Sequence, residues 1–284
     1  MLIEKKAYAK INLFLNVLNK RRDGYHNLEM VNAKIDLYDE IHIKKCQVST
    51  GIIIKSNDMF LSSQDNIILQ CARYMQDRYN IHYGMEIKIK KKIPYGAGLG
   101  GNSSDAAEVI RGISEVAELK LPEETLNDIA QMFGADIPYC LSNEVAYVTQ
   151  TGEDVKPIPN QLKGKSILLI HPKKHILTAD VFKHADKKGY KVKDINPLLS
   201  AIEKNDYGSI KNSLYNSLEE IVVEMDDAMR DFKSNLIQDI GDSGLVMTGS
   251  GSTFIKLLDE VNQGILDYID KNKDKFLINI YKII

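Results

Sequence analysis

The sequence predicts an α+β protein of two domains, residues 1–155 and 156–284. Several segments alternate apolar and polar residues with a period of two, which is typical of strands with one buried face. Other segments repeat their apolar residues every three to four positions and favour amphipathic helices. The segment Thr151 to Gly164 contains two glycines and two prolines, a composition typical of a linker between domains.

The composition is that of an ordinary globular chain with enough apolar residues for a sizeable core. Of its 284 residues, 44% are hydrophobic and 27% are charged. Because the formal net charge is only −2, we expect neither nucleic acid nor an anionic membrane as a partner. The one basic cluster, Lys88 to Lys92, alternates with isoleucines and is predicted to be the solvated face of a strand. We find no pattern in the sequence that indicates the oligomeric state.

Signals for targeting and for metal binding are weak. The first ten residues carry charges where a signal peptide needs an apolar core, and no apolar run reaches the length of about 18 residues that spans a membrane, so we expect a cytoplasmic protein. Cys46, Cys71 and Cys140 lie far apart and are predicted to be reduced and structural. His171 and His175 have a helical spacing, but a proline and two lysines lie between them, so no metal site made only of protein side chains is expected.

The first strand is predicted over residues 7–17, where apolar and polar residues alternate. Lys10 and Asn12 lie side by side on its polar face. From spacing alone, Lys10 is most simply a solvated lysine. The chain is expected to return as a second strand through residues 31–37, which alternate in the same way.

The connection between these two strands contains Asp23-Gly24, which is a strong signal for a tight hairpin turn. Tyr25 and His26 follow directly, although a tight turn does not require them. Together they could stack on a planar ring and hydrogen-bond it, while an exposed turn tip is the commoner interpretation of such residues.

Two helices of the first domain have recognisable ends. Residues 65–79 form an amphipathic pattern with Asp65 as its N-cap. Pro122 opens a later helix that Gly134 closes, following the usual preference for proline in the first turn and glycine just past the end. Asp136 then stands in a kinked connection between apolar residues. A carboxylate there is either an N-cap or a functional group, and the sequence leaves both interpretations open.

The rest of the chain follows the same two patterns. A strand over residues 145–149 is expected to close the first domain, and a strand over residues 166–170 to open the second. Amphipathic helices are predicted between residues 179 and 233. A second glycine turn, Thr248 to Thr253, is flanked by predicted strands at 245–247 and 254–258, and a helix and a strand at 277–283 follow.

The stretch Ile93 to Ala107, IPYGAGLGGNSSDAA, connects an alternating segment to a helical pattern. Glycine lets a bulky anion approach backbone N–H groups, and a helix N-terminus offers unpaired N–H donors at the positive end of its dipole, so we expect a phosphate ligand. The spacing G-x-G-x-x-G also occurs in dinucleotide-binding folds, but no second strand follows the helix. The Gly-Lys-Ser/Thr ending of a Walker A loop and the protein-kinase signatures are absent. A glycine-rich turn without a ligand is the remaining alternative.

Four segments resemble motifs of the GHMP kinases, small-molecule kinases that include galactokinase, homoserine kinase, mevalonate kinase and phosphomevalonate kinase. They read AYAKINLFLNVLNKRRDGYHNLEM, PYGAGLGGNSSDAA, GADIPYCL and TGSGSTFIKL. The segment PYGAGLGGNSSDAA is similar to the P-x-x-x-G-L-G-S-S motif that binds ATP. The N-terminal block, which contains D-G-Y-H, is most similar to members that act on a cytidine-diphosphate-linked sugar alcohol of the non-mevalonate isoprenoid pathway. The resemblance implies an N-terminal domain like domain 2 of ribosomal protein S5 and a ferredoxin-like C-terminal domain.

The resemblance also implies a catalytic pair, Lys10 and Asp136. Asp136 would take the proton from the substrate hydroxyl, and Lys10 would hold that carboxylate ionised and stabilise charge at the reacting oxygens. ATP is the implied co-substrate and Mg²⁺ the implied metal, held partly by Ser104 and otherwise by ATP and water. The residues implied in ATP binding are Asn66, Pro94, Tyr95, Gly96, Ala97, Gly98, Leu99, Gly100, Gly101, Asn102, Ser103 and Ser104.

A second set of residues is implied in binding a small-molecule substrate that has a cytidine diphosphate group. Tyr25 and His26 would hold the cytosine, assisted by Thr178 and Phe182. Asn12 would face the substrate from the strand that carries the catalytic lysine. The second glycine turn would close the site from the second domain.

Together these features predict an ATP-dependent kinase that phosphorylates the 2-hydroxyl of the sugar alcohol. Another GHMP-type kinase, acting on mevalonate or homoserine, is one alternative, and comparable turnover of substrates without cytidine would favour it. A non-catalytic nucleotide-binding protein is a second, which ATP binding without turnover would favour. An NADH-dependent oxidoreductase is a more distant alternative.

Overall fold

A computed structural model describes residues 2–46, 50–58 and 66–284 and confirms the α+β class, because helices accompany two separate sheets. Contacts between Cα atoms divide the chain into two compact units that interleave along the sequence. Unit 1 consists of Met1–Lys10, Leu37–Pro94 and Gly100–Asn143, and unit 2 of Ile11–Asp36, Tyr95–Leu99 and Glu144–Ile284. This division differs from the predicted domain boundary near residue 155, which stays a prediction.

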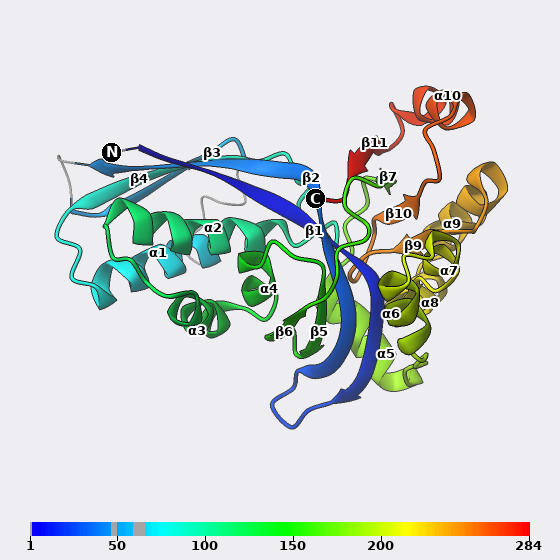
Figure 1. Ribbon diagram of the computed structural model, residues 1–284, viewed down its shortest axis with the longest axis horizontal. Coiled ribbons are helices and arrows are strands. Elements are labelled where there is room, and N and C mark those ends of the chain that lie inside the picture. The colour runs from blue at the N-terminus through cyan, green and yellow to red at the C-terminus, as the bar shows by residue number, and fades with distance from the viewer. Residues whose placement is uncertain (1, 47–49, 59–65) are drawn as a thin grey trace. The chain divides into compact units, whose positions relative to one another are not determined.

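Unit 1 is a sheet covered by helices (Figure 1). Its strand order is β3-β4-β2-β1, with β4 antiparallel to β2 and parallel to β3. The strands, two of which continue into unit 2, are β1 (Leu2–Lys20), β2 (His26–Cys46), β3 (Ile52–Ser56) and β4 (Gly84–Lys90). The helices are α1 (Ile67–Arg78), α2 (Gly101–Val116), α3 (Glu123–Phe133) and α4 (Ile137–Leu141).

The alternation in the sequence determines which face of this sheet is buried. Met85, Ile87 and Ile89 of β4 are at most 1% exposed, and Ile87 lies opposite Ile43 of β2 in the ladder. These side chains join those of α1 and α2 in one apolar core, while the helices lie along one side of the strands (Figure 1). Burial of the apolar face stabilises this layer arrangement.

Two helix ends of unit 1 can be compared with their predictions. The N-cap of α1 is Asn66, whose side-chain oxygen accepts a hydrogen bond from the backbone N–H of Ile68 at 2.9 Å. The predicted cap, Asp65, lies outside the described residues. Helix α3 begins after Pro122 and ends before Gly134, as predicted.

Unit 2 contains the remaining parts of β1 and β2, in the strand order β8-β1-β2-β5-β6, and a second sheet with the order β11-β7-β10-β9. Its other strands are β5 (Ala146–Gln150), β6 (Asp154–Pro157), β7 (Ser166–His171), β8 (Tyr215–Asn216), β9 (Leu245–Met247), β10 (Phe254–Leu257) and β11 (Leu277–Lys282). Its helices are α5 (Thr178–Lys188), α6 (Asn196–Glu203), α7 (Tyr207–Asn212), α8 (Ser217–Met225), α9 (Asp227–Ile240) and α10 (Gln263–Asn272). Among the described residues, none of the helices has the length and apolarity needed to cross a membrane.

The expected linker, Thr151 to Gly164, is partly wrong because it contains strand β6. This strand pairs antiparallel with β5, so that Val155 lies opposite Val148. The hydroxyl of Thr149 also donates to the carboxylate of Asp154 at 2.7 Å across the turn. The glycines and prolines that suggested a linker therefore flank a short hairpin strand.

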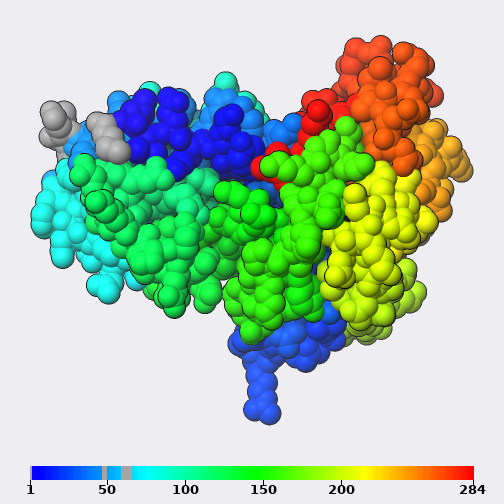
Figure 2. Space-filling model, in the orientation of Figure 1, coloured from blue at the N-terminus to red at the C-terminus, as the bar shows by residue number. Residues whose placement is uncertain are grey.

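The predicted hairpin between the first two strands is confirmed. Gly24 adopts a φ of 90°, which glycine accommodates better than other residues. Residues 22–25 are exposed, and the turn projects from the surface of unit 2 as the blue segment in Figure 2.

Candidate active site

The site begins in unit 1 with Lys10 and Asp136, which the sequence separates by more than 120 residues. Lys10 lies on β1 and is 4% exposed, and its Nζ is 3.8 Å from Oδ2 of Asp136. Asp136 occupies the N-cap position of α4, yet its side chain makes no capping hydrogen bond. Its carboxylate is 40% exposed. The Asp136 carboxylate therefore lies near the ammonium group and is open to a ligand, which favours the functional interpretation over the N-cap.

The N-terminus of α2 lies directly against this lysine. Gly100 is the N-cap residue, with a left-handed φ of 65°, and no side chain caps the helix. A Cβ atom on Gly100 would lie 2.8 Å from Cγ of Lys10, so only glycine lets the aliphatic stem of the lysine pass this closely. The first N–H groups of an uncapped α-helix point away from the helix and favour anions. In unit 1, a basic group and an anion-binding helix end are thus adjacent.

Residues 95–99 of the glycine loop belong to unit 2, where they pack against the second glycine turn. Gly98 has a φ of 73°, and a Cβ atom there would lie 2.3 Å from the carbonyl oxygen of Thr248. A Cβ atom on Gly249 would lie 2.8 Å from the carbonyl oxygen of Gly98. The two turns predicted from sequence therefore meet backbone to backbone, which glycine alone permits.

Aromatic and imidazole groups surround the same part of unit 2. The rings of Tyr95 and His175 are stacked, with their centroids 5.7 Å apart and an interplanar angle of 18°. His171 is 5% exposed, and its Nδ1 lies 3.2 Å from Oγ of Ser252 and 3.3 Å from Oγ1 of Thr253. Burial, together with the nearby His175, lowers the pKa of His171 to about 4, so this imidazole is neutral at pH 7.

Asn12 and Asn66 have contacts that explain their burial without a ligand. Oδ1 of Asn12 accepts a hydrogen bond from the backbone N–H of Gly249 at 2.9 Å, and its Nδ2 donates to Asn32 at 2.7 Å. Asn12 is fully buried and stabilises the second glycine turn. Asn66, which caps α1, is 7% exposed. Binding of substrate by Asn12 and of adenine by Asn66 stay predictions.

Ser104 does not present its hydroxyl as a metal ligand. The residue is 1% exposed, and its hydroxyl donates to the carbonyl oxygen of Tyr8 at 2.7 Å, with the sulfur of Cys140 at 3.3 Å. Across the described ranges, no group of three or more His, Cys, Asp and Glu side chains is arranged to hold a metal ion. The Mg²⁺ contact expected from Ser104 therefore gains no support from the described residues.

A second cluster in unit 2 brings His26 and Phe182 together. Their rings are stacked, with centroids 4.5 Å apart and an interplanar angle of 22°. Nε2 of His26 lies 2.8 Å from Oδ1 of Asp186, which also binds the ammonium of Lys20 at 2.5 Å. Tyr25 is 62% exposed at the tip of the turn. The structure thus brings together two of the residues predicted to bind the base and adds an acidic residue to them.

Comparisons with known proteins identify the family of the chain. Residues 66–144 match the model of the GHMP kinase N-terminal domain. The chain is 36% identical over 273 residues to a 4-diphosphocytidyl-2-C-methyl-D-erythritol kinase of Clostridium botulinum, covering 95% of this chain and 96% of the relative. The chain belongs to the GHMP kinase family. A kinase of the same name from Acetivibrio thermocellus is 35% identical, with 94% and 93% of the two chains covered.

A solved structure shows the same fold as this GHMP kinase. A crystal structure of 4-(cytidine 5'-diphospho)-2C-methyl-D-erythritol kinase matches with a TM-score of 0.79 over 99% of both chains, at 23% identity. Because identity at this level is low, the match shows the fold alone. Membership of the family also makes the chain an ATP-dependent small-molecule kinase.

Sequence reasoning missed Asp186 in this GHMP kinase, although the spacing contains a signal for it. Thr178, Phe182 and Asp186 follow one another at intervals of four residues on α5 and so share one helix face. The hydroxyl of Thr178 lies 2.7 Å from that of Ser250 in the second glycine turn. Hydrogen bonds from Lys20, Tyr190 and His26 hold the pKa of Asp186 far below its usual range, so the carboxylate is ionised.

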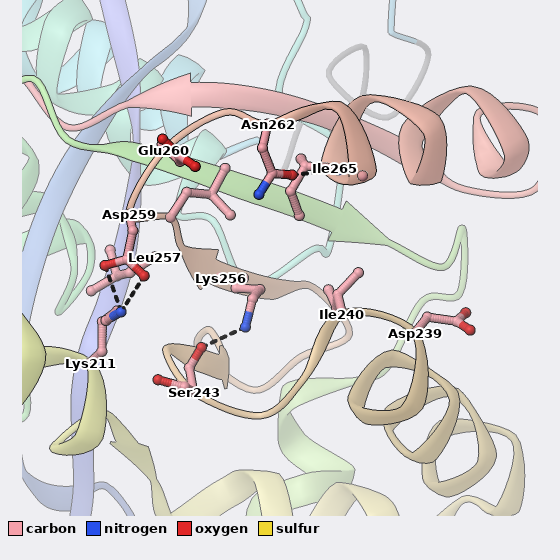
Figure 3. Close-up of a pocket in the computed structure, with 12 residues that line it drawn as sticks. Lys211, Asp239, Ile240, Ser243, Lys256, Leu257, Asp259, Glu260, Asn262 and Ile265 are labelled. Atoms are coloured by element: carbon pink, nitrogen blue, oxygen red, sulfur yellow. Dashed lines mark hydrogen bonds and ion pairs between the residues drawn. The ribbon is translucent and has the colours of Figure 1, made fainter.

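Unit 2 also has a cavity of about 620 Å³ that contains none of the predicted site residues (Figure 3). Lys211 and Asp259 form an ion pair at 2.6 Å on its wall. The ammonium of Lys256 donates to the carbonyl oxygens of Gly241 at 3.1 Å and Ser243 at 2.5 Å, just after helix α9. Both lysines therefore have structural partners, so the cavity has no evident part in phosphoryl transfer.

Proposed function

We propose that this GHMP kinase transfers the γ-phosphoryl group of ATP to the 2-hydroxyl of 4-diphosphocytidyl-2-C-methyl-D-erythritol. The observation that carries the proposal is the pairing of Lys10 with an accessible Asp136 carboxylate beside the uncapped start of α2. Relatives with that activity in their names match nearly the whole chain. The reaction belongs to the biosynthesis of isoprenoid precursors by the non-mevalonate route.

In this proposal Asp136 is the general base. Its carboxylate accepts the proton of the substrate hydroxyl as the oxygen attacks the γ-phosphorus atom. Lys10, buried and with its Nζ 3.8 Å from Oδ2 of Asp136, stabilises negative charge at the reacting oxygens. The bond from the γ-phosphorus to the β,γ-bridging oxygen breaks, and ADP leaves.

The ATP phosphates are assigned to residues 94–104. Gly96, Gly98 and Gly100 adopt positive φ angles, which glycine accommodates readily, and their lack of a Cβ atom would let phosphates approach the backbone of this loop. The N–H groups at the start of α2 supply donors for phosphate oxygens. Mg²⁺ stays a prediction. ATP and water would supply its ligands, because the hydroxyl of Ser104 donates a hydrogen bond to the carbonyl oxygen of Tyr8.

The cytosine is assigned to His26, Phe182 and Tyr25. The ring of Phe182 stacks on that of His26, and a neutral imidazole that donates its Nε2 hydrogen to Asp186 has Nδ1 as an acceptor. An acceptor suits the exocyclic amino group of cytosine, whereas uracil has a carbonyl oxygen there. Tyr25, exposed beside them, is free to cover the second face of the base.

The cytoplasmic location also stays a prediction.

The test is an ATP-consumption assay with purified protein and Mg²⁺ that compares 4-diphosphocytidyl-2-C-methyl-D-erythritol with mevalonate and homoserine. Turnover of the cytidine substrate alone supports the proposal. Comparable turnover of mevalonate or homoserine would keep the kinase chemistry and refute the substrate, and binding of ATP without any turnover would favour a non-catalytic protein. Glu144→Gln is a matched control for Asp136→Asn, because both change an acidic residue near α4 and only Asp136 is assigned to chemistry.

A further inference from the structure

Lys91 is buried between two aspartates just before the glycine loop, although the sequence predicted a solvated strand face for residues 88–92. Its Nζ lies 2.5 Å from Oδ2 of Asp39 and 2.6 Å from Oδ2 of Asp105. The lysine side chain is 6% exposed, and both aspartates are fully buried. The prediction was wrong for this residue because β4 ends at Lys90, and the alternation that directs its neighbours to solvent ends with it.

The three residues connect the two arms of the loop. We define the entering arm as residues 91–94 and the leaving arm as residues 100–105, both of which lie in unit 1. Asp39, on β2, accepts the backbone N–H groups of Lys92 at 2.5 Å and Ile93 at 2.8 Å, so it fixes the entering arm. Asp105 lies in the second turn of α2 and belongs to the leaving arm. Lys91 bridges the two aspartates and thereby ties one arm to the other.

The arms also touch through Gly101, the first residue of α2. A Cβ atom on Gly101 would lie 3.0 Å from Cγ2 of Ile93 and 3.3 Å from Nζ of Lys91. The entering arm therefore supports the helix end whose N–H groups are assigned to phosphate. A change in the spacing of the arms would move these donors.

Stability alone is a weak explanation for this cluster. Removing charged groups from water is costly, and well-packed apolar residues of similar size are often as stable. Burial, together with the neighbouring Asp39, raises the pKa of Asp105 to about 7, and one oxygen of Asp105 has no hydrogen-bond partner. What the cluster supplies that an apolar contact would not is a fixed, directional link.

We propose that Asp39, Lys91 and Asp105 are positioning residues for ATP, which set the orientation of the α2 N-terminus by holding the two arms of the loop at a fixed spacing. None of them is assigned a contact with ATP, and they act through Gly101 and the backbone of residues 92–93. The inference rests on the proposed binding of ATP by residues 94–104. A merely structural cluster would affect unfolding and leave the affinity for ATP unchanged.

The test compares Asp105→Ala with Asp105→Asn by titrating the protein with ATP in the absence of any alcohol. Alanine removes the link to Lys91 but leaves the Lys91–Asp39 ion pair, so we expect the dissociation constant for ATP to rise about tenfold, the effect of losing one charged hydrogen bond. Asparagine keeps an acceptor for Lys91 and should stay within about threefold of the parent protein. In the kinase assay the KM for ATP should follow the dissociation constant, while kcat changes less.

Glu86→Ala is the matched control. Glu86 lies on β4, is 9% exposed, and binds Lys55 at 2.7 Å and Lys44 at 3.0 Å, but it contacts neither arm of the loop through these pairs. We expect this variant to bind ATP like the parent protein. If Asp105→Ala does not fold, Lys91→Met combined with Asp105→Leu takes its place, because it exchanges two opposite charges for apolar side chains of similar size.

The outcomes separate this inference from the proposed reaction. Parent-like ATP affinity in Asp105→Ala, or in the double variant, would overturn the inference, as would equal losses in Asp105→Ala and Asp105→Asn. If the parent protein binds ATP but phosphorylates no alcohol, the proposed reaction fails, and the ATP titrations still decide the inference. A parent protein that does not bind ATP would refute both.

Discussion

Gly98→Ala should damage unit 2 more than its side chain of one carbon suggests. The φ of Gly98 is 73°, a left-handed conformation that costs an L-residue about 1–2 kcal/mol. The added Cβ would lie 2.3 Å from the carbonyl oxygen of Thr248, and the two backbones must separate by roughly 1 Å to restore an ordinary contact. Overpacking of this kind costs about 1–3 kcal/mol more, so we expect a total loss of about 2–5 kcal/mol.

Gly164→Ala isolates the conformational part of this loss. Gly164 has a φ of 80°, and a Cβ atom there would meet nothing within 4 Å. We therefore expect this control to lose only about 1–2 kcal/mol. Unfolding in urea, followed by circular dichroism, measures both variants against the parent protein.

Activity provides the second measurement. Because Gly98 lies within the loop assigned to the ATP phosphates, a shift of roughly 1 Å should lower kcat/KM for ATP about a hundredfold in Gly98→Ala. Gly164→Ala should leave it within about twofold. The reasoning would be refuted if both variants lost equal stability, or if Gly98→Ala folded stably with an unchanged kcat/KM.

Three further predictions concern single side chains. Asp136→Asn should lower kcat by about 10²- to 10⁴-fold and leave the ATP dissociation constant unchanged, and normal turnover would remove Asp136 from the role of base. Asp186→Asn should raise the KM for the cytidine substrate about tenfold, because His26 loses an ionised partner, while the KM for ATP stays constant. Since the pKa of His171 is about 4 in the folded protein and about 6.5 when unfolded, the unfolded state binds the proton first, and stability should fall by about 3 kcal/mol as pH drops from about 6.5 to about 4. His171→Gln should lack that part of the pH dependence in urea titrations, and an identical slope in both proteins would contradict the assignment.

Local patterns in the sequence predicted the local structure well. Alternation over residues 7–17 predicted strand β1, and Pro122 and Gly134 predicted the ends of α3. The solvated position predicted for Lys10 was wrong, because both faces of β1 are buried there and Lys10 and Asn12 are 4% and 0% exposed. The glycine loop and the helix after it were also predicted, because φ preferences and helix ends depend on nearby residues. These features need no knowledge of distant partners.

Features that depend on distant partners were not predicted from patterns. Strand β6 lies in a segment that reads as a linker, and its pairing with β5 defines it. In the sequence, Lys91 resembles its solvated neighbours, and only the structure shows that it forms ion pairs with Asp39 and Asp105. In the candidate site, the sequence around Asp136 left open whether this residue is an N-cap or a functional group. Its partner, Lys10, lies more than 120 residues earlier in the chain.

The interleaving of the two units bears on the order in which the ribosome makes them. All segments of unit 1 have been synthesised by Asn143, so this unit can fold while the chain is still growing. The stretch Ile11–Asp36 is made early, but its partners include Tyr215 of β8 and Ile283, which bridges to Ile35. Some of the first apolar strand residues to leave the ribosome therefore remain unpaired until their partners near the end of the chain have been synthesised. During that interval their unpaired edges are exposed to other chains, and a chaperone that shields extended segments would have its greatest effect there.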